Sequence, residues 1–265
     1  MTSTVLVGNK KGGIGKTTTI VNLAYEASQR GKKTLIIDLD QQSNASAYFS
    51  GTDFKYDIGD VLIDRKLNIK DAIVPAVINN EPQENLFLIN GRGGDDYEEL
   101  ELKVSSMPHR EQRMQFALRD IKDEFDYIFI DTPPTVNTLH SNGITAADHI
   151  IVPVDYNEMA LNGINSYLNT ISEIKMCDED EISFTILPTR IKRSCSVTNE
   201  YGKGLLSAIY EEQTANTTIY EKATFNHSER NYVPVRVHKK SCESAMYYKN
   251  FFVELNKQLA ETTPA

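Results

Sequence analysis

The chain has 265 residues, of which 40% are hydrophobic and 25% charged, with 14 glycines and 9 prolines. These values are typical of globular proteins and exclude disorder or low complexity as a description of the whole chain. The longest apolar runs, such as Ile150–Val154, have the length of a strand, far short of the ~18 residues of a membrane span. We therefore expect a soluble protein with a substantial core.

The start of the chain and its cysteines indicate the compartment. The N-terminus enters an apolar run at once, without a basic segment or a cleavage site, so we expect no signal peptide. The cysteines Cys177, Cys195 and Cys242 are few, odd in number and far apart, which fits a reducing environment. The expected localisation is cytoplasmic.

Charge is distributed unevenly along the chain. The net charge is −9, yet residues 186–259 hold 11 Lys and Arg against 7 Asp and Glu. An acidic protein with a basic C-terminal third is not a bulk nucleic-acid binder, but it can present one local basic face. An ordinary solvated surface explains the same pattern, and this alternative stays open.

Short apolar runs alternate with longer helical patterns along the chain. The expected strands are Thr4–Gly8, Thr34–Asp38, Leu86–Ile89, Tyr127–Asp131, Ile150–Val154 and Phe184–Leu187. The expected helices are Lys16–Arg30, part of Ile58–Val74, Arg110–Glu124, Gly163–Ile174 and Tyr247–Leu259. The strands are continuously apolar, which predicts an α/β fold: a doubly wound, mostly parallel sheet flanked by helices. No repeat or linker divides the chain, so we expect one domain over residues 1–265.

The loop after the first strand has the composition of a phosphate-binding loop. Gly12, Gly13 and Gly15 allow successive backbone N–H groups to point inward at the N-terminus of the next helix. Lys16 can then reach the β- and γ-phosphates, and the Thr17 hydroxyl can bind Mg²⁺. A plain glycine-rich turn is the alternative, but Gly-Lys-Thr between a strand and a helix is a specific pattern.

Carboxylates follow the second and fourth strands. Asp38 and Asp40 are two residues apart at a strand end, so they point to the same side. Asp131 ends an apolar strand and precedes Thr132-Pro133-Pro134, the arrangement of a Walker B acid that holds Mg²⁺ directly or through water. Helix capping by Asp40 and an ordinary turn after Asp131 are the alternatives. The carboxyl ends of neighbouring parallel strands lie at one edge of a sheet, where ligands bind.

The phosphate loop departs from the standard pattern in one way. Lys10 stands where the first glycine is expected, and Lys11 directly precedes the glycines. With these features the sequence resembles the deviant Walker A loop of the ParA/MinD family of ATPases. The resemblance covers roughly residues 3–190, with further similar stretches at residues 38–45, 125–131, 146–148, 151–154 and 158–163.

The resemblance implies a P-loop ATPase that uses ATP and Mg²⁺. It implies that Lys11 reaches the partner's nucleotide across a dimer interface. Asp40 would orient the attacking water with support from Asp38, although Gln41 replaces the family's usual proline. Thr17 and Asp131 would hold the metal. The nucleotide would be held by Lys11, Gly12, Gly13, Ile14, Gly15, Lys16, Thr17 and Thr18.

Several branches of the family can be compared with this sequence. Membrane-binding MinD-like proteins end in a basic amphipathic helix, whereas here Phe251, Phe252, Leu255 and Leu259 form an apolar face that favours core packing. Three scattered cysteines argue against a cluster-binding relative. Thr4 already begins the first strand, so we expect no preceding helix-turn-helix domain. The pattern is most similar to small, Soj-like ParA-type partition ATPases.

The resemblance also implies partners. We expect an ATP-dependent homodimer, associated with the nucleoid through non-specific double-stranded DNA, whose slow hydrolysis is stimulated by a ParB-like or cargo adaptor protein. We expect no membrane contact. The alternatives are a nucleotide-dependent enzyme, such as a synthetase or kinase relative, and a MinD-like membrane-positioning ATPase. The candidate DNA contacts are Arg190, Lys192, Arg193, Lys222, Arg230, Arg236, Lys239, Lys240 and Lys249.

Overall fold

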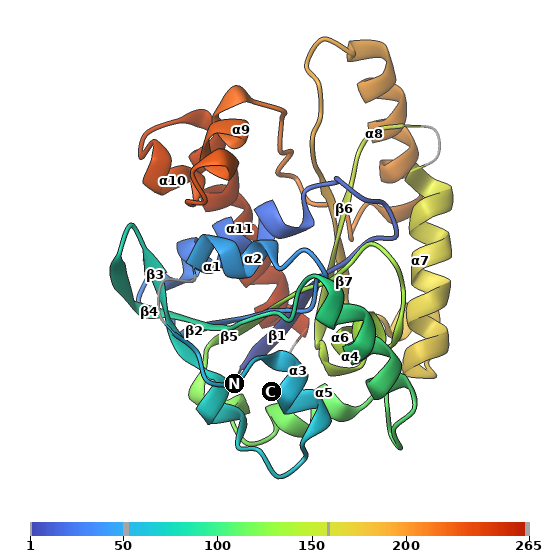
Figure 1. Ribbon diagram of the computed structural model, residues 1–265. Helices are drawn as coiled ribbons and strands as arrows, with labels where there is room; N and C mark the ends of the chain where they lie inside the picture. Colours follow the sequence, from blue (N-terminus) through green and yellow to red (C-terminus); the bar gives the residue numbers. More distant parts are fainter. Residues whose placement is uncertain (1, 50–52, 158–159, 263–265) are drawn as a thin grey trace.

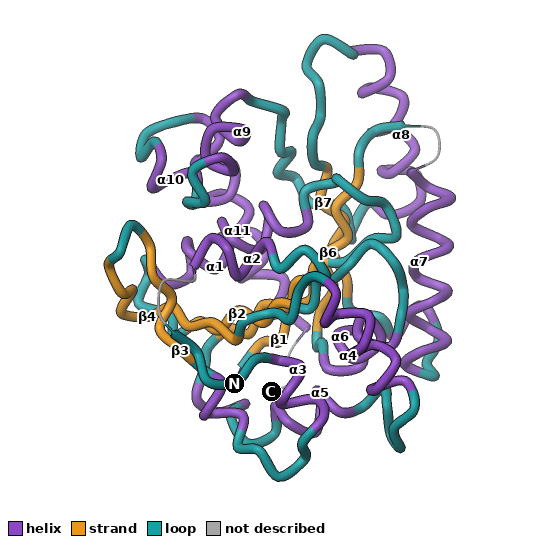
Figure 2. The backbone as a smooth tube through the Cα atoms, viewed as in Figure 1, coloured by secondary structure: helices purple, strands orange, loops and turns teal. Residues whose placement is uncertain are grey.

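The computed structural model describes residues 2–49, 53–157 and 160–262; Glu158 and Met159, part of the resemblance above, lie outside these ranges. The described strands form one sheet in the order β3-β4-β2-β5-β1-β6-β7 (Figures 1 and 2). The strands are β1 (Ser3–Val7), β2 (Thr34–Asp38), β3 (Val74–Ile78), β4 (Glu81–Ile89), β5 (Tyr127–Asp131), β6 (His149–Val154) and β7 (Phe184–Pro188).

Helices cover both faces of this sheet (Figure 1). One face carries α1 (Lys16–Ser28), α2 (Asn44–Phe49), α9 (Ala223–Arg230), α10 (Val235–His238) and α11 (Glu243–Thr262). The other carries α3 (Ile58–Ile63), α4 (Asp95–Ser105), α5 (Arg113–Leu118), α6 (Thr138–Ala146), α7 (Ala160–Lys175) and α8 (Ser196–Tyr210). Short 3₁₀ turns lie at Ile69–Ala72, Lys122–Glu124 and Glu179–Glu181.

The strand interior explains this layering. In β1, Val5 and Val7 join one hydrophobic cluster and Leu6 joins the other, and all three are fully buried. Apolar side chains on both faces of a parallel strand require cover on both sides. The fold therefore confirms the predicted doubly wound, mostly parallel architecture. The register aligns Asp131 with both Val7 and Asp38, which brings the chemistry-bearing strand ends together.

The third expected strand, Leu86–Ile89, covers only the second half of β4. The structure adds an edge hairpin in which β3 pairs antiparallel with β4, whereas the sequence pattern placed Val74 at the end of a helical segment. Asn79 and Asn80 have φ values of 51° and 64°, so both occupy the left-handed region that a two-residue hairpin turn requires. Asparagine tolerates this conformation better than most residues.

One expected helix is shorter than predicted: the segment 110–124 contains α5 and a 3₁₀ turn. The segment 58–74, expected to be helical in part, contains α3 and another 3₁₀ turn. A capping box formed by Asp57 and Asp60 fixes the start of α3.

The C-terminal helix α11 packs against α1, in agreement with the core role expected for its apolar face. Phe251 and Leu255 are fully buried, and Phe252 and Leu259 are nearly so. In the part of the chain that the structure describes, no helix combines the length and apolar character that a membrane span requires.

Candidate nucleotide site

The phosphate loop joins β1 to α1 in the conformation that its glycines permit. Gly13 and Gly15 have φ values of 67° and 91°, a region that favours glycine. The N-cap residue of α1 is Gly15, which has no side chain to accept from the first turn of the helix. The first backbone N–H groups of this helix are therefore available to an anion, and the helix dipole favours negative charge at the same point.

The two lysines next to the glycines point to different places. Lys16 is buried in the pocket, with its Nζ 3.4 Å from the carbonyl oxygen of Lys11. Burial lowers the pKa of Lys16, while the charges of Asp131 and Asp40 partly oppose this shift. Lys11 instead extends along the surface, where its half-exposed side chain pairs with Asp155 at 2.6 Å.

Thr17 and Asp131 form the pair expected to hold the metal. The Thr17 hydroxyl donates to Asp131 Oδ2 at 2.7 Å. Burial and then the charge of neighbouring Asp38 raise the pKa of Asp131 well above its usual value. A buried acid next to a second acid favours a cation, and hydroxyl and carboxylate oxygens are ligands that Mg²⁺ prefers. The residues present therefore fit Mg²⁺ shared with nucleotide phosphates.

Asp38 supports the loop that follows β2. Its Oδ2 accepts from the Ser46 backbone and hydroxyl, both at 2.8 Å, and its Oδ1 accepts from the Asp40 N–H at 3.1 Å. Burial raises the pKa of Asp38 to about 6, although these hydrogen bonds oppose the shift. The supporting role that the resemblance implies for Asp38 stays a prediction.

Asp40 lines the pocket itself. Its Oδ1 accepts from the Gln42 N–H at 2.9 Å, and its carboxyl group is close enough to Lys16 for the lysine's charge to lower its pKa. Burial is the larger effect, and the net result is a raised pKa. Asp40 and Lys16 thus face the same space from two different loops.

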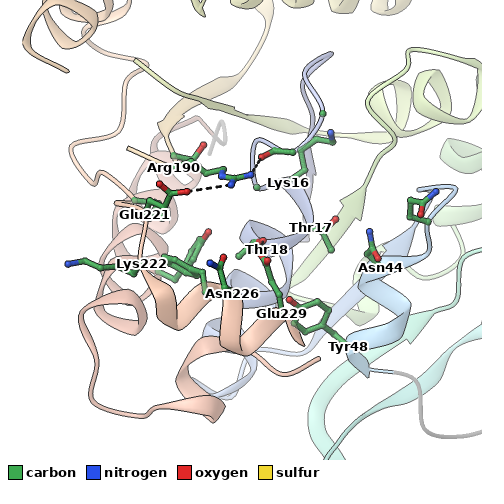
Figure 3. A pocket seen from close by; sticks show the side chains of 18 of the residues that line it. Lys16, Thr17, Thr18, Asn44, Tyr48, Arg190, Glu221, Lys222, Asn226 and Glu229 are labelled. Atoms are coloured by element: carbon green, nitrogen blue, oxygen red, sulfur yellow. Dashed lines mark hydrogen bonds and ion pairs between the residues drawn. The ribbon is translucent and has the colours of Figure 1, made fainter. Parts of the chain in front are cut away.

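The pocket extends well beyond the phosphate loop (Figure 3). Its volume is about 490 Å³, and its far wall comes from the C-terminal third. The sequence pattern did not predict this wall. One signal was present, because Thr189 and Arg190 follow the carboxyl end of β7, at the sheet edge where ligands are expected. The residues that were not predicted to line it are Gln42, Asn44, Tyr48, Pro134, Thr189, Arg190, Ile219, Tyr220, Glu221, Lys222, Phe225, Asn226, Glu229, Tyr232 and Tyr248.

The predicted nucleotide residues are mostly brought together. Ile14 is buried, and its carbonyl accepts from the Thr189 hydroxyl at 2.9 Å, which ties the loop to the strand β7 edge. Thr18 donates to Glu229 at 2.9 Å. The predicted residues that line the pocket are Gly12, Gly13, Gly15, Lys16, Thr17, Thr18 and Asp40.

The candidate DNA contacts do not form one free basic face. Arg190 and Lys222 line the nucleotide pocket, and Arg190 donates to the Gly13 carbonyl. The remaining pairings place Arg190 and Lys192 with Glu221, Arg193 and Lys222 with Glu243, and Arg236 with Glu26.

A smaller cationic group carries no ion pair within the described ranges. Its members are exposed and lie on α9, just after α10, and on α11. They are Arg230, Lys239, Lys240 and Lys249. We refer to these four residues as the α9–α11 cations.

Comparison with known proteins identifies the family. A family model described as an AAA domain matches residues 2–184. The chain is 33% identical over 214 residues to the sporulation initiation inhibitor protein Soj of Bacillus subtilis, covering 78% of this chain and 81% of Soj. It is 27% identical over 265 residues to the chromosome-partitioning ATPase Soj of Treponema pallidum, covering 96% and 97%. It is 33% identical over 178 residues to the chromosome partitioning protein ParA of Myxococcus xanthus, covering 64% of this chain and 58% of ParA.

Solved structures share the fold. Cobyrinic acid a,c-diamide synthase from Mycobacterium smegmatis, with bound ADP and magnesium, superposes with a TM-score of 0.79 at 23% identity, covering 99% of this chain and 97% of that one. A putative plasmid partition protein from Borrelia burgdorferi, bound to AMPPNP, gives 0.76 at 21% identity, covering 99% and 100%. The chain belongs to the AAA-domain family that its sequence matches and, within it, to the ParA/Soj group of P-loop ATPases.

Proposed function

We propose that this ATPase binds ATP with Mg²⁺, dimerises in that state, and then binds double-stranded DNA without sequence preference. A ParB-like or cargo adaptor protein would stimulate hydrolysis, and the cycle would segregate or position DNA or another large cargo. Partitioning is part of the names of the Soj and ParA relatives from Treponema and Myxococcus. This precedent supports the proposal for the present chain.

The observation that carries the proposal is that Lys11 and Lys16 point to different places. Lys16 lies inside the pocket, whereas Lys11, five residues earlier in the same loop, leaves its side chain half-exposed at the surface. Lys11 does not line the pocket of its own molecule. In the proposed dimer it would leave Asp155 and reach the nucleotide of the second copy.

The residues divide the work of hydrolysis among them. The loop N–H groups and Lys16 would hold the phosphates. Thr17 and Asp131 would hold Mg²⁺, which neutralises phosphate charge when bound. Asp40 lines the same pocket and would orient a water molecule toward the γ-phosphate, while Asp38 accepts a hydrogen bond from the Asp40 backbone. Phosphoryl transfer asks mainly for such positioning and charge stabilisation.

The α9–α11 cations support the DNA part of the proposal. They are free of ion pairs within the described ranges, in contrast to Arg190, Lys192, Arg193, Lys222 and Arg236. A dimer doubles this group, and the phosphate contacts that it makes add up along one duplex. We therefore assign the DNA contact to these four residues of each copy.

Three substitutions separate the steps of the cycle. We expect Lys16→Ala to lose ATP binding, because the phosphates lose their buried cation. Asp40→Ala should bind ATP and accumulate as a dimer, because the attacking water is no longer oriented. Lys11→Ala should bind ATP as a monomer. Sedimentation velocity with ATP, beside a nucleotide-binding assay, measures all three. An ATP-dependent Lys11→Ala dimer as stable as the wild-type dimer would contradict the proposal.

A further inference from the structure

A buried histidine and a buried tyrosine lie between the phosphate loop and the loop that follows β5. His140 in α6 and Tyr167 in α7 are both fully buried, and His140 Nε2 lies 2.7 Å from the Tyr167 hydroxyl. Their rings meet at 5.7 Å with an angle of 64°. Neither residue lines the nucleotide pocket. The pair is therefore a polar contact inside the core, next to the site but not part of it.

One end of the pair touches the phosphate loop. A Cβ atom built on Gly8, the first residue after β1, would lie 1.9 Å from the Tyr167 hydroxyl oxygen. The hydroxyl therefore packs directly on the backbone where the phosphate loop begins. The Gly8 N–H donates to Ile151 at 3.0 Å, so this backbone cannot move away without breaking a contact to β6.

The other end faces residues 132–137, the loop between Asp131 and α6. Burial lowers the pKa of His140 to about 4, and the carbonyl groups of Thr135 and Pro133 only partly oppose that shift. Among the described residues, His140 Nδ1 has no hydrogen-bond partner. A neutral ring that accepts the Tyr167 hydroxyl at Nε2 carries its hydrogen on Nδ1. This buried donor thus faces two carbonyl groups and, among the described residues, makes no hydrogen bond to either.

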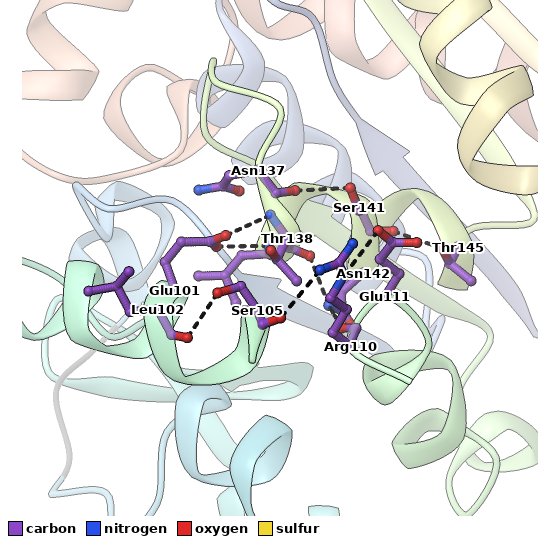
Figure 4. Close-up of polar contacts among 11 residues, drawn as sticks. Glu101, Leu102, Ser105, Arg110, Glu111, Asn137, Thr138, Ser141, Asn142 and Thr145 are labelled. Atoms are coloured by element: carbon purple, nitrogen blue, oxygen red, sulfur yellow. Dashed lines mark hydrogen bonds and ion pairs between the residues drawn. The ribbon is translucent and has the colours of Figure 1, made fainter. Parts of the chain in front are cut away.

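Hydrogen bonds hold both ends of this loop. The Thr132 hydroxyl donates to the Val7 carbonyl at 3.0 Å. At the other end, the Asn137 side chain accepts from the His140 N–H, and Glu101 of α4 accepts from the N–H groups of Thr138 and Leu139 at 2.8 and 3.1 Å (Figure 4). Pro134, between these anchors, lines the nucleotide pocket. A small shift of residues 133–135 changes both the pocket wall and the partner available to His140 Nδ1.

We propose that His140 and Tyr167 are positioning residues for ATP hydrolysis, which couple the placement of residues 133–135 to the phosphate loop. Nucleotide that contacts the Pro134 wall moves a loop carbonyl into line with His140 Nδ1, and an otherwise unpaired buried donor is satisfied. The hydroxyl of Tyr167 fixes the ring that makes this contact. The inference rests on ATP hydrolysis alone and needs neither DNA nor an adaptor protein.

Tyr167→Phe tests the coupling, because it removes the hydroxyl group and keeps the aromatic ring. We expect kcat for ATP to fall about three- to tenfold with KM changed less than about twofold, because binding contacts remain and positioning is lost. Tyr210→Phe is the matched control: its hydroxyl donates to Asn165 of the same helix α7 at 2.6 Å, away from the phosphate loops. We expect the control to keep kcat within about twofold of wild type.

Hydrogen–deuterium exchange supplies a readout that does not depend on turnover. With a non-hydrolysable ATP analogue, we expect slowed exchange of the amides of residues 135–137 in the wild type and in Tyr210→Phe, and clearly weaker protection in Tyr167→Phe. Equal kcat values for the two variants, or equal protection of this loop in all three proteins, would overturn the inference. If the isolated wild type hydrolysed no ATP, the exchange comparison alone would decide it.

Discussion

Lys11 and Asp155 form an ion pair that the proposed dimer would have to break. The pair spans the phosphate loop and the loop after β6, and both side chains are partly exposed. Asn9 ties the phosphate loop to β6, because its Nδ2 donates to the Pro153 carbonyl at 2.7 Å and its Oδ1 accepts from the Lys11 N–H. In the proposed dimer, Asp155 would therefore compete with the phosphates of the second copy for the same ammonium group.

Removing that competitor should favour the dimer. We expect Asp155→Asn to dimerise at ATP-bound protein concentrations up to about fivefold lower than wild type, the limit set by the modest strength of exposed ion pairs. Concentration-dependent sedimentation with ATP measures the change. Glu124→Gln removes a comparable exposed pair with Lys70 and serves as the control. Weaker dimerisation of Asp155→Asn than of the control would show that Asp155 assists rather than competes.

The buried carboxylates predict an unusual pH dependence of stability. The pKa of Asp38 is about 6 in the folded protein and near 3.8 in an unfolded chain, so the folded state binds more protons between these values. Stability contributed by Asp38 is therefore full below about pH 4 and is lost as the pH rises toward 6.

Asp38→Asn removes this titration. We expect the free energy of unfolding of the variant, relative to wild type, to rise between pH 4 and pH 6, whatever the offset from its altered hydrogen bonds. Urea denaturation of the nucleotide-free proteins at several pH values provides the comparison. A difference that stays constant across this range would show that Asp38 does not titrate as proposed.

At the scale of elements, helix α11 belongs to the core. Phe251 is fully buried, whereas Val253, two residues later, is 48% exposed. We expect Phe251→Ala to lower the free energy of unfolding by about 3–5 kcal/mol, and Val253→Ala to change it by less than ~0.5 kcal/mol. Urea denaturation of the two variants checks this. A loss below ~1 kcal/mol for Phe251→Ala would mean that α11 contributes little to the fold.

The sequence predicted those elements whose local pattern and burial agree. Thr34–Asp38 and Tyr127–Asp131 are observed with the predicted bounds, because their continuous apolar runs end at a charged residue. The edge strand β3 was missed, since its partner is antiparallel and its turn uses two asparagines instead of a glycine. The phosphate loop and its carboxylates were predictable because their chemistry is local.

The far wall of the pocket was not predictable in the same way. It is built from Tyr48 of α2, the loop after β7, residues 219–222 and α9, segments that only the tertiary fold brings together. Arg190 and Lys222 looked like unpaired cations because a sequence does not reveal that Arg190 pairs with Glu221 and Lys222 with Glu243. The distribution of charge along the chain therefore overstated the basic face.

At the scale of the whole molecule, the proposed DNA binding requires an acidic protein to bind an acidic polymer through a small group of cations. The net charge is −9, and the α9–α11 cations provide four positive charges in each copy. If each copy neutralises two or three phosphates, a dimer releases the counterions of about four to six phosphates. Its affinity for DNA then falls steeply with salt, whereas a monomer binds weakly. DNA binding should therefore follow the nucleotide state that forms the dimer.

Binding to a random-sequence duplex tests this claim most directly, measured with ATP, ADP or no nucleotide at two salt concentrations. Lys240→Glu probes the α9–α11 cations, and Lys66→Glu, an equal change of charge at an exposed residue outside this group, is its control. We predict salt-sensitive DNA binding with ATP alone, which Lys240→Glu weakens and Lys66→Glu does not. An ATP-bound dimer that binds no DNA at either salt concentration would contradict it.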